Sequence, residues 1–193
     1  MIAEDEAWRP AEDDVIARGD RVTLRRKRLA DAASDYAWRA DAELARYDAA
    51  PPLRIDFREF LLVFAEDLDQ PNPLRRTYAI DDESGRHIGN IMYYNIDRRR
   101  HQAELGITIG DRNYWSRGYG TDAVRTLVRH IFTETDLTRV FLNTLNWNER
   151  AQRAFEKAGF QRCGRDRRDG YDFVVMETFR DGFLSAAPPP ETT

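Results

Sequence analysis

The stretch NYWSRGYGTDAVRTLVRHIF, residues 113–132, sets two glycines directly before the clearest helical pattern in the chain. After the glycines, apolar side chains recur at the three- and four-residue spacing of a helix with one buried face. They are Val124, Leu127, Val128, Ile131 and Phe132. Gly118 and Gly120 let backbone N–H groups converge at the helix start, where the first turn carries partial positive charge. The stretch therefore predicts either an anion-binding helix N-terminus or a tight helix entry in which the glycines serve only the turn.

The loop GYGTDA also matches G-x-G-x-x-A, the fingerprint of dinucleotide-binding folds. In that fingerprint the first glycine follows a strand at once, whereas here DRNYWSR lies between them. The next apolar strand has no acidic residue at its end to hold a ribose, because Asn143 and Asn146 occupy that region. No Gly-Lys-Ser/Thr follows, which excludes a Walker A loop. The sequence thus argues against nicotinamide, flavin and nucleoside triphosphate binding.

Strand and helix patterns outside this stretch alternate without a regular repeat. We expect strands at residues 21–27, 74–81, 86–97, 101–110, 138–145, 160–167 and 171–179. Helices are expected at residues 31–40 and 56–68, after the glycine loop, and at residues 149–158. Three strands in a row precede Gly118 and are joined by short turns, which is unlike a chain of βαβ units. The sequence therefore predicts a mixed α/β fold.

One folded domain with a tail at each end fits the 193 residues. We interpret residues 1–20 as a loosely attached acidic arm, residues 21–183 as the domain and residues 184–193 as a disordered tail. The start of the chain lacks the basic and apolar regions of a secretory signal. No apolar run approaches the roughly 18–20 residues of a membrane helix. We therefore expect a soluble cytoplasmic protein.

Composition excludes several kinds of site. The net charge is −4, and acidic residues are interspersed among the basic clusters at 25–28 and 98–100, which favours exposed surface charges over a nucleic-acid patch. Cys163 is the only cysteine, which excludes a disulfide framework. His87 and His130 show no metal-ligand spacing with each other or with acids. We expect no metal, no nucleic-acid partner and no membrane partner.

Two motifs together carry a resemblance to a known family. The block AELGITIGDRNYWSRGYGTDAVRTLVRHIF, residues 103–132, is followed at the family's separation by TRVFLNTLNWNERAQRAFEKAGF, residues 138–160. This arrangement resembles the GCN5-related N-acetyltransferases (GNAT), and within them the branch of ribosomal-protein-alanine and polyamine N-acetyltransferases. The match extends over about residues 75–180. The resemblance implies the GNAT fold, a central, mostly antiparallel sheet of about seven strands, splayed in the middle, with about four helices.

By this resemblance the anion at the glycine loop is the pyrophosphate of coenzyme A, and acetyl-CoA is the co-substrate. The family's loop, Gln/Arg-x-x-Gly-x-Gly/Ala, falls on Trp115 through Gly120, with Trp115 in place of the first Gln or Arg. In the family the strand before the loop carries a bulge and splays from the next strand, and the pantetheine arm bonds its exposed backbone like an added strand. The residues that the resemblance implies for the phosphates and the arm are Ile107, Thr108, Ile109, Arg112, Arg117, Gly118, Tyr119, Gly120 and Thr121.

The second motif is the asparagine that opens the later helix, Asn148 in NERAQRAFEKAGF. Asn146 and Glu149 have the spacing of a capping box, so we assign the helix cap to Asn146. Asn148 is then free for a role beside the pantetheine arm, which the resemblance implies. Ala151 and Phe155 would line the same wall of the site.

Acetyl transfer to an amine needs a base, because an amine with a pKa of about 8–10 is mostly protonated at neutral pH. Glu104, at the start of the splayed strand, is the candidate base; the alternative is a salt bridge with an arginine. His101 is a second candidate base. Many relatives have a tyrosine, the acid for the leaving thiolate, where this chain has Phe155. The hydroxyls that remain as unplaced substitutes are those of Tyr93, Tyr94, Tyr119 and Tyr171.

We therefore expect an acetyl-CoA-dependent N-acetyltransferase that transfers acetyl directly to a primary amine. The acceptor is a protein N-terminus, a polyamine or an amino-sugar antibiotic. The absence of a tyrosine at Phe155 keeps open a second class, a non-catalytic acyl-CoA-binding sensor or scaffold with the same fold. A homodimer through the C-terminal strands is a further expectation from the resemblance.

Overall fold

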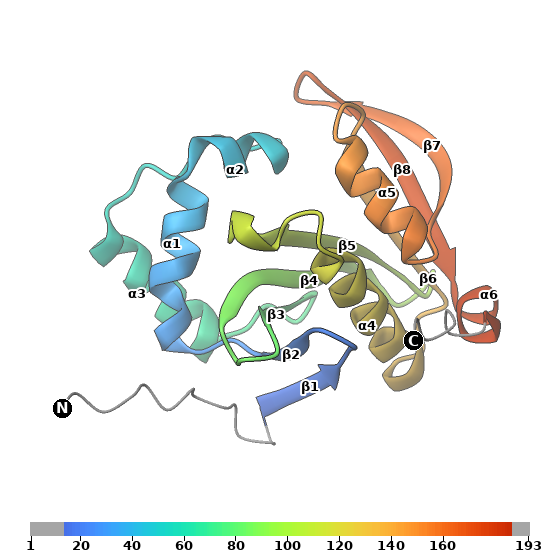
Figure 1. The fold of residues 1–193 in the computed structure, drawn as a ribbon, viewed down its shortest axis with the longest axis horizontal. Helices are drawn as coiled ribbons and strands as arrows, with labels where there is room; N and C mark the ends of the chain where they lie inside the picture. The colour runs from blue at the N-terminus through green and yellow to red at the C-terminus, as the bar shows by residue number, and fades with distance from the viewer. Residues whose placement is uncertain (1–13, 187–193) are drawn as a thin grey trace.

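The computed structural model describes residues 14–186 and contains one eight-stranded sheet with helices on both faces (Figure 1). The strand order is β1-β2-β3-β4-β5-β6-β8-β7, and all neighbours are antiparallel except the central pair β5 and β6. The strands are β1 Val15–Arg18, β2 Thr23–Arg26, β3 Arg75–Asp81, β4 His87–Asp97, β5 Gln102–Ile109, β6 Arg139–Leu145, β7 Gln161–Arg168 and β8 Tyr171–Phe179. The helices are α1 Ala32–Ala40, α2 Ala42–Tyr47, α3 Phe57–Asp69, α4 Tyr119–Glu134, α5 Glu149–Lys157 and α6 Arg180–Ser185.

Helix α4 supplies the centre of the hydrophobic core. The five apolar residues whose spacing predicted the helix are all buried, with exposed fractions of 3% or less. They pack with side chains from β2 to β6 and from β8, and with Phe155 of α5, on one face of the sheet. Burying a side chain of this size contributes about 1.5–3 kcal/mol. On the other face, Asp35 of α1 accepts hydrogen bonds from Lys27 and from Asn90 of β4.

The predicted mixed α/β class and the mostly antiparallel sheet are confirmed, but the counts of elements were too low. Strand β1 lies inside the segment that we interpreted as a loosely attached arm, and it pairs with β2. Helices α2 and α6 have six residues each, too few to show a helical period in the sequence. The remaining parts of the expected arm and tail, residues 1–13 and 187–193, lie outside the described residues.

A single carboxylate fastens the turn between β1 and β2 to the start of α4. Asp122 accepts hydrogen bonds from the backbone N–H groups of Asp20, Arg21 and Val22 at 3.2, 2.8 and 3.1 Å. The turn comes so close that a Cβ at Gly19 would lie 2.5 Å from a carboxylate oxygen of Asp122. The first helical turn of α4 is therefore held in place from the N-terminal side of the sheet.

None of the helices among residues 14–186 is long and apolar enough to span a membrane.

Candidate functional site

The central strands β5 and β6 pair only at their beginnings. The register joins Gln102 with Arg139, Ala103 with Val140 and Glu104 with Phe141. Although both strands are described to their ends, no pair forms beyond these three. The sheet is therefore splayed at its centre, as the resemblance implied, and the later half of β5 has an edge without a neighbouring strand.

The exposed edge of β5 is formed by the backbone of alternate residues. Gly110 donates its N–H to the carbonyl oxygen of Ile88 at 3.0 Å, which turns Gly110 toward β4. Because successive residues of a strand direct their backbone groups to opposite sides, Ile107 and Ile109 face the gap. Trp115 donates its indole N–H to the backbone oxygen of Ile109 at 2.7 Å, so this carbonyl group already has a partner. The other groups of Ile107 and Ile109 are suited to bind an extended chain like an added strand.

Helix α4 begins beside this gap, at the two glycines. Gly118, which precedes the first helical residue, has a φ of 90°, in the left-handed region that favours glycine. A Cβ on Gly120 would instead meet the Ile109 side chain at 3.7 Å, an ordinary van der Waals contact. Gly118 is therefore needed for the turn, whereas Gly120 is not required by the fold and keeps the helix start open to a ligand.

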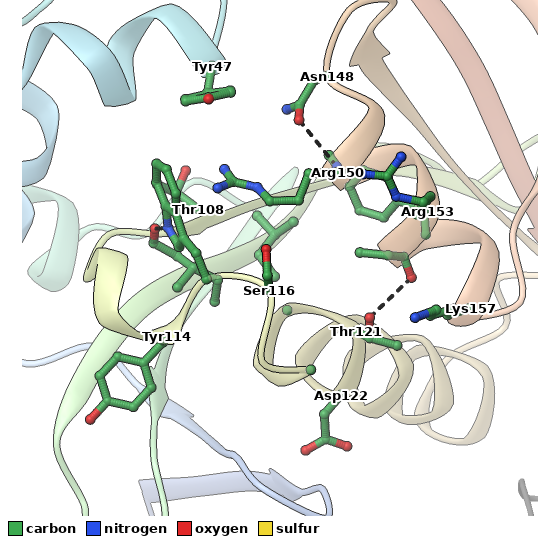
Figure 2. Close-up of a pocket in the computed structure, with 18 of the residues that line it drawn as sticks. Tyr47, Thr108, Tyr114, Ser116, Thr121, Asp122, Asn148, Arg150, Arg153 and Lys157 are labelled. Carbon is green, nitrogen blue, oxygen red and sulfur yellow. Dashed lines mark hydrogen bonds between the residues drawn. The ribbon is translucent and has the colours of Figure 1, made fainter.

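A cavity of about 560 Å³ lies over the start of α4 and between β5, α2 and α5 (Figure 2). Most of the residues predicted to bind the coenzyme line it. They are Ile107, Thr108, Ile109, Gly118, Gly120, Thr121, Asn148, Ala151 and Phe155. Segments almost 50 residues apart in sequence are thus brought to one cavity.

Three residues of the predicted set are not part of the cavity lining. The Arg112 side chain pairs with Asp41 and Glu43 of the α2 segment, each at 2.8 Å. Arg117 donates to a backbone carbonyl of its own loop at 3.2 Å. The ring of Tyr119 is buried in the core, with 6% of its surface exposed, and its hydroxyl donates to a carboxylate of the turn between β3 and β4. The structure therefore directs these side chains away from the proposed phosphate site.

Five basic side chains that the sequence analysis did not select line the cavity instead. They are Arg21, Arg125, Arg150, Arg153 and Lys157. The guanidinium of Arg125 also donates to the carbonyl of Lys157 at 2.9 Å and so joins α4 to α5. Arg150, Arg153 and Lys157 lie three and four residues apart on α5, so they share one face of the helix. In the sequence alone, this pattern is equally typical of a polar face in contact with solvent. Together with the N–H groups of α4, these cations make this side of the cavity electropositive.

Asn148, not Asn146, caps α5, so our assignment of the cap was wrong. The side-chain oxygen of Asn148 accepts the N–H of Ala151 at 3.2 Å. The helix begins at Glu149, so the residue directly before it, and not the one three positions earlier, occupies the N-cap position. The carbonyl of Asn146 accepts a side-chain hydrogen bond from Gln152 at 2.9 Å. Asn148 also lines the cavity, and its amide nitrogen is turned away from α5 in Figure 2.

A cation–π bridge crosses the upper part of the cavity. The guanidinium carbon of Arg150 lies 3.6 Å from the ring centre of Trp115. It lies 5.0 Å from the ring centre of Tyr47, and Arg150 and Tyr47 are labelled in Figure 2. The two rings meet edge-on at 5.5 Å between centres. Such a contact stabilises a partly buried pair by about 0.5–2 kcal/mol. The bridge connects α2, the glycine loop and α5, which come from separate parts of the chain.

Glu104, the predicted base, is 5% exposed and does not line the cavity. One carboxylate oxygen accepts the side-chain N–H of Asn143 at 2.7 Å, and the other accepts that of Asn95 at 3.0 Å. The guanidinium of Arg168 lies 3.7 Å away, so the salt bridge we considered as the alternative is present. The role of Glu104 as a base stays a prediction.

The bulge implied for β5 lies in β4 instead. Between the pairs Tyr94–Glu104 and Asp97–Gln102, β4 has one residue more than β5. Asn95, within this bulge, has a φ of 51°, which asparagine tolerates better than most residues. The bulge therefore places the side chain of Asn95 where it reaches Glu104.

The other candidate groups lie outside the cavity lining. His101 is half exposed, and its ring nitrogen is 3.3 Å from the carboxylate of Asp136. Burial, together with the charge of Glu104, raises the pKa of Tyr94. Within residues 14–186 no group of three or more histidine, cysteine, aspartate or glutamate side chains could hold a metal ion.

Comparison with known proteins places this geometry in a family. Residues 21–161 match the acetyltransferase (GNAT) domain. The uncharacterized N-acetyltransferase p20 of Bacillus licheniformis is 27% identical over 146 residues, which is 75% of this chain and 82% of that protein. The spermidine N-acetyltransferase from Vibrio cholerae, in complex with CoA and spermine, superposes with a TM-score of 0.74 at 18% identity, over 84% of this chain and 98% of that one. The aminoglycoside acetyltransferase AAC(6')-Ib, in complex with coenzyme A, superposes with a TM-score of 0.70 at 24% identity, over 84% of this chain and 97% of that one.

At these identities the solved structures show the fold alone, whereas the domain match shows the family. That match begins at β2 and ends at β7, so it includes the splayed strands, the glycine loop and α5. The chain therefore belongs to the acetyltransferase (GNAT) domain family, as the resemblance implied, and the protein is an N-acetyltransferase.

Proposed function

We propose that the protein binds acetyl-CoA in the cavity over α4 and transfers the acetyl group directly to a primary amine. The observation that carries this proposal is the position of the cavity. It joins the open edge of β5 to the N-terminus of α4 and is bordered by basic side chains. A coenzyme with an extended amide-containing arm and several phosphates is complementary to these three features.

The phosphates would lie at the helix start. Backbone N–H groups from Gly118 to Thr121 supply donors, and Arg125, Arg153 and Lys157 supply positive charge from α4 and α5. The carboxylate of Asp122, which also lines the cavity, is held by three backbone N–H groups of the turn between β1 and β2 and forms no ion pair with these cations within residues 14–186.

The pantetheine arm would extend along β5. Its amide groups would bond the backbone of Ile107 and Ile109, and Ala151 and Phe155 would cover its apolar part from α5. The amide of Asn148, whose oxygen is committed to the helix cap, has its nitrogen left for a carbonyl of the arm. The thiol that leaves has a pKa of about 8.5, so its departure needs little help from an acid. The phenylalanine at position 155 is therefore compatible with catalysis.

The acceptor class is an amine, and three kinds stay candidates: a protein N-terminus, a polyamine or an aminoglycoside. The structural neighbours include a spermidine and an aminoglycoside acetyltransferase, which supports the last two. We propose that residues 21–183 form the catalytic domain, with β1 attached to it.

Thiol release tests the proposal directly. Purified protein is mixed with acetyl-CoA and, in turn, polyamines, aminoglycosides, amino acids and peptides that begin with alanine or serine. Free thiol should appear with at least one class of amine, and mass spectrometry should show that amine heavier by one acetyl group. Calorimetry should show binding of coenzyme A in the same preparation. Tight binding of coenzyme A without thiol release would instead support the non-catalytic acyl-CoA sensor.

A further inference from the structure

The carboxylate of Asp48 lines the cavity beside β5, whereas the other two carboxylate residues of the lining, Asp20 and Asp122, lie at the start of α4. Asp48 follows α2, and both of its carboxylate oxygens lie 3.3 Å from the hydroxyl of Thr108 on β5. Within residues 14–186, Thr108 is the one residue whose side chain hydrogen-bonds this carboxylate. Asp48 therefore retains lone pairs for a donor that enters the cavity.

The position of Thr108 relates Asp48 to the gap in the sheet. Thr108 lies between Ile107 and Ile109, whose backbone groups face the gap where the acyl-carrying arm is proposed to lie. Its side chain is on the face of the sheet opposite α4, since its cross-strand partner Asn90 contacts α1 on that face. Asp48 thus stands over the proposed acyl path from the side of α1 and α2.

Glu104 lies four residues before Thr108 on the same strand, but its situation is different. Amide donors of Asn95 and Asn143 occupy both of its oxygens, and Arg168 is 3.7 Å away. Asp48 lines the cavity and is bonded only by a hydroxyl, at long distance. Of Glu104 and Asp48, only Asp48 lines the cavity, so it is the carboxylate that an amine in the cavity can reach directly.

The surroundings of Asp48 also suit a base. Asp48 is exposed to solvent at the cavity, but the protein atoms around its carboxyl displace enough water to raise its pKa to about 6, against the opposing effects of the Thr108 hydroxyl and the charge of Arg39 on α1. Tyr94 on β4 also interacts electrostatically with Asp48, and its raised pKa keeps it uncharged well above neutral pH. Tyr47 and Arg150 line the same cavity. The carboxylate is therefore ionised at neutral pH yet more basic than an ordinary aspartate, which favours proton removal near pH 7.

We propose that Asp48 receives the ammonium group of the acceptor in the cavity and takes one of its protons. This inference rests on the proposed function and names the base within it. The neutral amine nitrogen then attacks the thioester carbonyl carbon, the C–N bond forms, and the C–S bond breaks with its electron pair going to sulfur. The second proton lost by nitrogen passes to the thiolate. Asp48 releases its own proton to water before the next turnover.

The test compares wild type with Asp48→Asn and with a matched control, Glu43→Gln. Both substitutions remove one carboxylate charge from the α2 segment, but Glu43 is 56% exposed, pairs with Arg112 and does not line the cavity. Turnover is measured from pH 5 to 9 at saturating acetyl-CoA, with an amine found by the thiol-release screen. Calorimetry measures acetyl-CoA binding and the binding of spermine to the protein–CoA complex.

For Asp48→Asn we expect kcat/KM to fall by about 10²- to 10⁴-fold with acetyl-CoA affinity nearly unchanged. The activity of wild type should fall as the pH drops through about 6, because Asp48 becomes protonated. The activity of the variant should not show this decrease around pH 6. Spermine should bind wild type and Glu43→Gln alike, and Asp48→Asn at least tenfold more weakly.

Full turnover in Asp48→Asn at pH 7, with the wild-type pH profile, would overturn the role of Asp48 and leave the acetyltransferase proposal intact. If no amine supports thiol release by wild type, the proposed function fails, and the spermine titration then decides about Asp48 alone. Equal spermine affinity in wild type and Asp48→Asn, or no binding to either, contradicts the inference.

Discussion

The indole nitrogen of Trp115 donates a hydrogen bond to the carbonyl oxygen of Ile109, at 2.7 Å. This bond closes the loop between β5 and α4 onto the open edge of β5. The same ring carries the guanidinium of Arg150 at 3.6 Å from its centre. Trp115, which stands where the family loop usually has Gln or Arg, therefore connects the strand edge, the glycine loop and α5.

Replacing Trp115 by phenylalanine separates these two contacts. An aromatic ring remains for Arg150, but the carbonyl of Ile109 loses its donor in a partly buried place. We expect the free energy of unfolding to fall by about 0.5–1.5 kcal/mol, measured by urea denaturation. Trp147→Phe is the matched control, because the Trp147 ring packs on Tyr47 but its N–H has no hydrogen-bond partner within residues 14–186. Equal losses in the two variants would show that the Ile109 bond contributes nothing.

The two glycines of the loop should respond differently to valine. Gly120→Val leaves the fold intact, because a Cβ there has ordinary contacts, but the side chain blocks a phosphate approaching the N–H groups. Coenzyme A affinity should fall at least tenfold, about 1.4 kcal/mol, by calorimetry. Gly118→Val should lower stability as well, since its φ of 90° strains any side chain. Gly182→Val, with nothing within 4 Å of a Cβ, is the control and should bind normally. If folded Gly120→Val binds coenzyme A with unchanged affinity, the phosphates do not bind at this loop.

Asn148 combines a helix cap with a place in the cavity, and two substitutions can separate these roles. Asn148→Ala removes both, so we expect a loss of about 0.5–2 kcal/mol of stability together with weaker coenzyme binding. Asn148→Ser keeps a capping oxygen and should recover the stability without the binding. Asn146→Ala should change neither, since its side chain does not cap α5. Melting temperatures and calorimetry on the three variants decide this. If only Asn146→Ala loses stability, Asn146 and not Asn148 caps α5.

The parts of the site that the sequence predicted are those encoded by local patterns. The stripe from Val124 to Phe132 and the glycines before it are contiguous in sequence, so α4 could be predicted from this segment alone. The cap of α5 was misplaced because Asn146 and Asn148 both suit the position, and a shift of the helix start by two residues exchanges them. The roles of Asp48 and Arg150 could not be found this way. Each depends on a partner far away in sequence, Thr108 for the first and Trp115 for the second.

The stability of Asp48→Asn provides a check that needs no substrate. Partial desolvation at the cavity raises the pKa of Asp48 to about 6 in the folded protein, above the value of about 3.9 in an unfolded chain. Folding therefore binds a proton at Asp48 between these two values, and the stability that Asp48 contributes is lost as the pH rises from about 4 to about 6. Asparagine does not titrate, so the variant escapes this loss. We expect the melting temperature of Asp48→Asn, relative to wild type, to rise across this interval and to stay level above pH 7. If the difference in melting temperature does not depend on pH, the carboxylate titrates like an ordinary exposed aspartate and is too weak a base for the step assigned to it.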